Sequence, residues 1–105
     1  LRTATRDAHD RIERLPAAQA MAAGAVDRDS YTAILGRLYW VHAAFEEAAA
    51  RLPDLAPVWP PEAVRADAVV RDLEALGAAR PATPPPAVVA WADQLNAAAS
   101  AAAWA

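Results

Sequence analysis

The sequence contains no cysteine, and this absence removes several kinds of chemistry at once. Disulfides, thiolate metal sites and thiol nucleophiles all depend on cysteine side chains. A metal ion in this chain must therefore be held by histidine or carboxylate groups. The two histidines are His9 and His42.

Long apolar runs and lysine are missing as well. No stretch reaches the roughly 20 apolar residues of a membrane span, and the first residues lack the order of a signal peptide. All ten basic residues are arginine, and thirteen acidic residues leave a net charge of -3. Such a balance offers no broad basic surface for DNA, RNA or an anionic bilayer. We therefore expect a cytoplasmic protein whose partners include neither nucleic acid nor a membrane.

Alanine dominates what is present, with 32 of the 105 residues. Much of the 56% hydrophobic content is therefore a small, strongly helix-forming side chain. A chain of this length can supply one core, and no segment shows the alternation of a strand. We predict an all-α fold with a single domain over residues 1–105.

The first third of the chain shows three helical segments. Apolar residues at spacings of three and four predict a helix over residues 1–15, closed by Pro16, and a short helix over 17–23 stopped by Gly24. Asp27 is a good N-cap for a long helix. We expect one face of that helix to carry Tyr31, Ile34, Leu35, Leu38, Val41, Phe45, Ala48 and Leu52.

Prolines divide the remainder. Four prolines between residues 53 and 61 break the chain, although apolar side chains among them favour an ordered connection. We expect a fourth helix from Pro61 to Leu76, ended by Gly77, then a stiff linker over 80–86. A last helix follows from Pro86 to the final residue. Its stripe would be Val88, Ala92, Leu95, Ala99 and Ala102.

Thr5, His9 and Glu13 lie four residues apart, so they stack along one edge of the first helix beside its apolar stripe. This arrangement suits an axial iron ligand, because an imidazole can bind iron through one nitrogen while the other donates to Glu13. Arg6 and Arg2 precede His9 by one and two turns and could meet anionic groups. The alternative is an ordinary surface helix with ion pairs.

His42 occupies the long helix and is followed by Glu46 and Glu47. It could line a pocket, or it could be a boundary histidine bonded to a backbone carbonyl. A carboxylate-histidine iron site is a further hypothesis, although neither histidine has the Glu three positions before it that such sites use. The aromatic residues Tyr39, Trp40, Trp59, Trp91 and Trp104 are expected mainly to pack, and Trp104 could also lie against a flat ligand.

The opening segment LRTATRDAHDRIE resembles the first helix of the heme oxygenase family, which reads Leu-Arg/Lys-x-Ala-Thr-x-x-x-His with Glu four residues after the histidine. The matching positions are Leu1, Arg2, Ala4, Thr5, His9 and Glu13. Residues 24–52 and 61–77 are similar to later segments of the family in order and spacing. The resemblance spans the whole chain and corresponds to about the N-terminal half of a family member.

The resemblance implies a heme-oxygenase-like helical bundle and a role for each residue of the opening segment. His9 would be the proximal ligand of the heme iron, and Glu13 would hold the second nitrogen of its imidazole. Arg2 and Arg6 would lie near the heme propionates, and Thr5 would line the proximal wall.

The resemblance also implies an activity. In this family heme is both cofactor and substrate, and O2 with electrons from an external reductase or ferredoxin converts it to biliverdin, carbon monoxide and ferrous iron. His42 would join the water network on the distal side.

One family feature is missing from these residues. The distal helix of the family carries a Gly-rich kink, Gly-Asp/Ser-x-x-Gly-Gly, whereas Gly24, Gly36 and Gly77 form no such motif. We therefore expect the chain to be the N-terminal part of a longer heme-oxygenase-like domain, without its distal helix. Two alternatives remain open: a heme-binding or sensing module, and a non-catalytic helical interaction domain.

Overall fold

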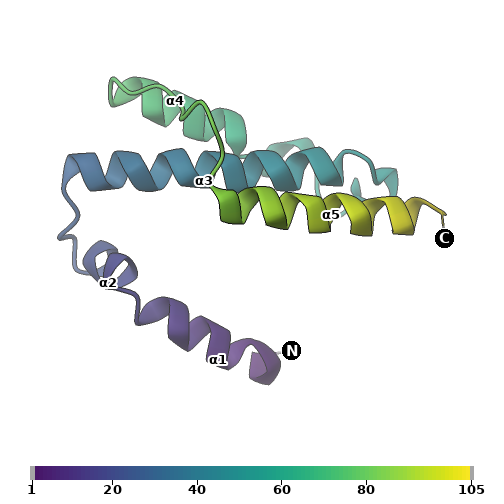
Figure 1. The fold of residues 1–105 in the computed structure, drawn as a ribbon, viewed down its shortest axis with the longest axis horizontal. Helices are drawn as coiled ribbons and strands as arrows, with labels where there is room; N and C mark the ends of the chain where they lie inside the picture. Colours follow the sequence, from purple (N-terminus) through teal and green to yellow (C-terminus); the bar gives the residue numbers. More distant parts are fainter. Residues whose placement is uncertain (1, 105) are drawn as a thin grey trace. The chain divides into compact units, whose positions relative to one another are not determined.

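The computed structural model describes the backbone of residues 2–104 and the side chains of residues 3–102. In chain order the helices are α1 (Arg2–Glu13), α2 (Pro16–Ala22), α3 (Arg28–Ala49), α4 (Ala66–Ala75) and α5 (Pro86–Trp104) (Figure 1). Two 3-10 turns, η1 (Pro53–Leu55) and η2 (Pro61–Ala63), lie between α3 and α4. The described residues contain no strand, so the predicted all-α class is confirmed. None of these helices is both long enough and apolar enough to cross a membrane.

The chain divides into two compact units, Leu1–Tyr31 and Thr32–Ala105. In the first unit α1 contacts α2. The first helix ends at Glu13, two residues earlier than expected, because Pro16 holds Leu15 in an extended conformation with ψ of 137°. Gly24 ends the second helical segment with φ of +67°, in the left-handed region that glycine adopts without strain.

Asp27 caps the long helix as the sequence indicates. Its Oδ1 accepts a hydrogen bond of 2.7 Å from the backbone N–H of Ser30. Hydrogen bonds from the Ser30 backbone and side chain lower the pKa of Asp27 below its usual value, because they stabilise the charged carboxylate. The N-cap and the start of α3 are thus both set by local sequence.

The second unit is built around α3. Figure 1 shows α4 running antiparallel to it and α5 running in the same direction as its C-terminal half. The core cluster joins α3 to α4 through Leu35, Tyr39, Ala66, Val69 and Leu73, and Leu73 is only 1% exposed. Ala99 of α5 is also buried. The core cluster therefore lies where α3 packs against α4.

The expected apolar face of α3 is wrong in part. Leu35 and Ala48 are buried, but Tyr31 and Leu38 are 40% and 39% exposed. The helix instead turns Leu35 and Tyr39 toward α4, with Gly36 buried beside them. The contact with α4 determines which side of α3 is buried. The spacing of apolar residues along α3 alone does not predict that side.

The fourth helix begins later than expected. Pro61 opens the η2 turn, Val64 then adopts an extended conformation with ψ of 133°, and α4 starts only at Ala66. Glu46 of α3 caps this start, because its Oε1 accepts hydrogen bonds from the backbone N–H groups of Arg65 at 2.6 Å and Ala66 at 3.1 Å. The end is as predicted, with Gly77 at φ of +73°.

The linker between α4 and α5 is attached to α3 by three contacts. The Nη1 of Arg80 donates to the hydroxyl oxygen of Tyr39 at 2.6 Å, and the Nε1 of Trp40 donates to the carbonyl oxygen of Pro81 at 3.2 Å. The Pro81 ring also lies directly over Gly36. The linker is therefore an ordered connection, and it leads into α5 at Pro86 as predicted.

Candidate functional site

His9 and Glu13 face each other across one turn of α1. The Nδ1 of His9 lies 3.6 Å from Oε1 of Glu13, and the two side chains are 69% and 65% exposed. A separation of four residues produces this pairing in any regular helix. A small rotation of either side chain would bring the pair into hydrogen-bonding distance. The imidazole can then bind an iron atom through its other nitrogen while Glu13 fixes its orientation.

The side chains near His9 in the sequence are mostly exposed. Ile12 and Leu15, three and six residues after His9, are 61% and 54% exposed. Thr5 and Arg6 are exposed one turn before His9. The side chain of Arg2 lies outside the described residues. His9, with Arg6 exposed one turn before it, is therefore chemically compatible with a heme, which would offer iron to the imidazole and carboxylates to arginine.

The carboxylate of Asp10 lies close to the side chains of His9 and Glu13, which the sequence pattern does not predict. One possible ligand atom from each of the three residues lies within 4.8 Å of the other two. Among the described side chains this is the one group of three His, Asp or Glu residues so arranged. Neighbours in a helix point about 100° apart, so the sequence spacing of Asp10 gave no signal.

His42 is half-buried on α3, in the second unit. The iron site suggested for it with Glu46 and Glu47 is not assembled. One oxygen of Glu46 is bound to the backbone at the start of α4, and Glu47 lies 3.5 Å from Arg51 Nη2. Glu46 therefore caps the start of α4, and Glu47 pairs with Arg51 on the surface of α3.

The aromatic residues pack, as expected. Tyr39 and Trp40 meet edge to face with ring centroids 5.0 Å apart, and Phe45 and Trp59 do so at 4.9 Å. Trp91 is half-buried on α5. The side chain of Trp104 lies outside the described residues. Aromatic pairs of this geometry stabilise the fold beyond their buried area.

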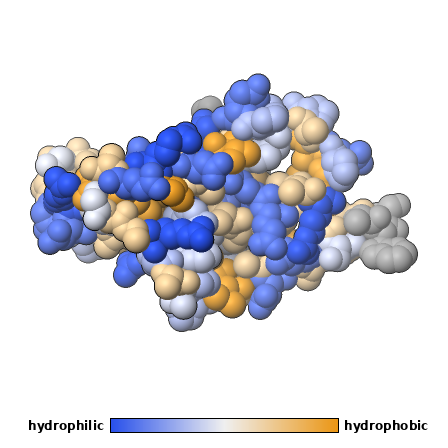
Figure 2. All heavy atoms as spheres, turned by 90° about the horizontal axis from the view of Figure 1, so that it is seen from above, coloured by the Kyte–Doolittle hydropathy of each residue, from blue (hydrophilic) through white to orange (hydrophobic). Residues whose placement is uncertain are grey.

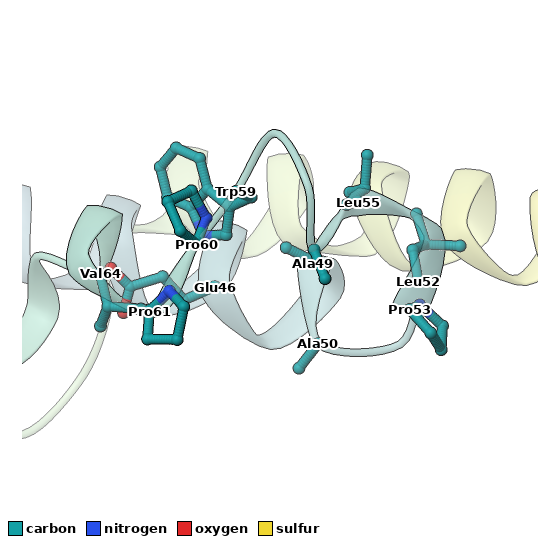
Figure 3. A pocket seen from close by; sticks show the side chains of 11 residues that line it. Glu46, Ala49, Ala50, Leu52, Pro53, Leu55, Trp59, Pro60, Pro61 and Val64 are labelled. Carbon is teal, nitrogen blue, oxygen red and sulfur yellow. The ribbon is translucent and has the colours of Figure 1, made fainter.

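A cavity of about 380 Å³ lies beside the end of α3. Figure 3 shows Trp59 and Pro60 over one side, Leu52, Pro53 and Leu55 on the other, and Glu46 directed toward Pro61 and Val64. Its one ionisable group is Glu46, which already accepts two backbone hydrogen bonds. None of the residues predicted to bind heme lines it.

Large apolar side chains are exposed at scattered positions of the described surface: Ile12, Leu15, Met21, Tyr31, Leu38, Val58, Val64 and Val89. On the face drawn in Figure 2, hydrophobic side chains form small separate areas among hydrophilic ones. Single exposed apolar residues are ordinary in soluble proteins.

The described residues define an all-α protein whose first helix carries an exposed imidazole–carboxylate pair. Comparison with known proteins narrows this class. The family described as "Heme oxygenase" matches residues 1–103. The chain belongs to the heme oxygenase family.

A curated relative supports the same assignment. The protein named Heme oxygenase 1 from Synechocystis sp. is similar to this chain, with 31% identity over 77 residues. That alignment covers 70% of this chain and 32% of the relative, so the chain spans about a third of the relative's length. No solved structure matches the chain significantly.

Proposed function

We propose that this chain binds heme through His9 and forms the proximal part of a heme oxygenase. The observation that carries the proposal is the His9–Glu13 pair, exposed on the first helix of a heme oxygenase family member. The name of the Synechocystis relative agrees with it. When bound, heme would serve as cofactor and substrate, and O2 with an external reductant would convert it to biliverdin, carbon monoxide and ferrous iron.

Each residue of the first helix has a distinct part in this proposal. His9 would present one imidazole nitrogen to the iron, and the carboxylate of Glu13 would accept a hydrogen bond from the N–H of the other nitrogen and so fix the ring. Arg6 and Arg2 supply positive charge for the propionates, and Thr5 lines the proximal wall. His42 would hold a proton in the distal water network.

The remaining parts of the proposal concern the whole protein. A reductase or ferredoxin would deliver the electrons, and the reaction would take place in the cytoplasm. The 105 residues contain three glycines and no Gly-rich kink. We propose that residues 1–105 are part of a single domain and supply the proximal side of its heme site. Ring opening would also need a Gly-rich distal helix.

Hemin titration tests the ligand assignment. The wild-type chain is expected to develop a Soret band, and His9→Ala is expected to abolish it because the iron loses its protein ligand. Glu13→Gln should weaken hemin binding by about tenfold, since a second partner that orients a ligating histidine contributes on that scale. His42→Ala is the matched histidine control and should keep the band. An unaltered hemin spectrum in His9→Ala would refute the assignment.

A heme-binding or sensing module is the second candidate, because the exposed His9–Glu13 pair would serve it equally well. Such a module would bind hemin through His9 in the same way. Addition of ascorbate or a flavoprotein reductant to the full-length protein that contains these residues separates the two candidates, because a heme oxygenase opens the ring to biliverdin whereas a sensing module keeps the heme intact. The absorbance of biliverdin, measured on the hemin-loaded protein after reductant is added, is the readout.

A further inference from the structure

We propose that α1 also binds a divalent transition-metal cation when heme is absent, through His9, Asp10 and Glu13. The three possible ligand atoms lie within 4.8 Å of one another on one helix. Ligand atoms about 2.0 to 2.2 Å from a zinc ion stand roughly 3 to 4 Å apart. Small side-chain rotations therefore suffice to close the three groups around one ion, with no movement of the backbone.

The donor set selects the kind of ion. One imidazole nitrogen and two carboxylate oxygens suit zinc or ferrous iron, whereas magnesium and calcium prefer oxygen ligands throughout. Three protein ligands leave further positions for water, which is the pattern of an open zinc site. A neutral imidazole with two carboxylates also balances the charge of a dication.

Asp10 is available for this role. It is half-buried, and no ion pair or hydrogen bond of its side chain occurs among the described residues. It borders a hollow of about 390 Å³ that Asp7, Arg11 and Arg14 also line. The two arginines oppose a cation there, so the direct ligands must supply the affinity.

The cation site and the proposed heme site share His9. The competition between the two ligands therefore rests on the proposed function, whereas cation binding to the heme-free protein does not. A bound dication at His9 and Glu13 would replace the interaction that orients the imidazole for heme iron. Heme loading would then be weaker in the presence of the cation.

Calorimetric titration of zinc chloride into the heme-free 105-residue protein tests the site directly. We expect one zinc ion per chain. His9→Ala and Asp10→Asn should each weaken zinc binding by at least about tenfold, because each removes a direct ligand. Asp7→Asn is the matched control, since it removes the same charge from the same helix outside the three-residue group. It should leave the zinc affinity unchanged.

Equal weakening by Asp7→Asn and Asp10→Asn would overturn the site, because it would show general attraction to acidic charge. Unchanged affinity in His9→Ala would overturn it too. Far-UV circular dichroism of each variant confirms that α-helix is retained. Hemin titration without zinc then separates the two proposals: hemin binding without zinc binding removes this inference alone, and zinc binding without hemin binding removes the heme assignment alone.

Discussion

At the scale of single residues, the candidate site was predictable where helix periodicity determines geometry. A spacing of four residues brings His9 to Glu13 in any α-helix, and the structure places them 3.6 Å apart. Asp10 was not predictable, because its approach depends on rotamers that no spacing rule contains. The role of Glu46 was hidden for a different reason. Its partners, Arg65 and Ala66, lie about twenty residues further along the chain.

Asp27 gives a residue-scale prediction about pH. Hydrogen bonds from Ser30 lower the pKa of Asp27 below its ordinary value of 3.8, so the charged carboxylate stabilises the folded state. This contribution is present above pH 3.8 and is lost as the pH falls through the lowered pKa of the folded state. Asp27→Asn keeps an oxygen that can cap α3 but removes the titration.

The measurement is the thermal unfolding midpoint of wild type and Asp27→Asn across that range. The wild type is expected to have the higher midpoint near neutral pH, and the difference should shrink toward zero in strong acid. Asp27→Ala should lower the midpoint further at neutral pH, because it removes the cap as well. A wild-type advantage that stays constant from neutral to strongly acid pH would contradict the assigned cause.

At the scale of elements, helix positions were more predictable than helix faces. Gly24 and Gly77 end their segments as the sequence indicates, because their positive φ angles are a local property. The start of α4 was misplaced, since Pro61 fits the first position of a 3-10 turn as well as that of an α-helix. The buried face of α3 was misplaced because α4 and the linker decide which side is covered.

Gly36 supports an element-scale prediction about how the linker holds α3. A Cβ at this position would lie 2.8 Å from Cγ and 3.0 Å from Cδ of Pro81, which is too close. Gly-to-Ala replacement inside a helix normally stabilises it by about 1 kcal/mol. We expect Gly36→Ala not to gain this stability. Pro81 would have to move away from the new Cβ, and its movement would strain the hydrogen bond that Trp40 donates to the Pro81 carbonyl oxygen.

A double-mutant cycle with Pro81→Ala isolates the contact. Pro81→Ala removes the two ring atoms, so Gly36→Ala in that background should recover the stabilisation of about 1 kcal/mol. Urea unfolding of the four proteins gives the free energies. If Gly36→Ala changed stability equally in both backgrounds, the Pro81 ring would not be what requires glycine at this position.

At the scale of the whole molecule, burial is unevenly distributed between the two units. Every buried side chain of the described residues belongs to Thr32–Ala105, and those described in the first unit are exposed or half-buried. Helical stability in proteins comes mainly from packing, and an isolated helix of twelve residues is marginal in water. The 12 residues of α1 carry the proposed ligand, so the candidate site lies on a short helix without a buried side chain among its described residues.

Hydrogen exchange measures this difference in support. In the heme-free protein the amides of α1 should show protection factors below about ten, while those around Leu35 and Leu73 should exchange far more slowly. Hemin bound at His9 would add contacts that only the folded helix can make, so it should slow exchange in α1. The slowing should be absent in His9→Ala and present in His42→Ala. Strong protection of α1 without heme would show that burial elsewhere, and not the ligand, holds the helix that carries His9.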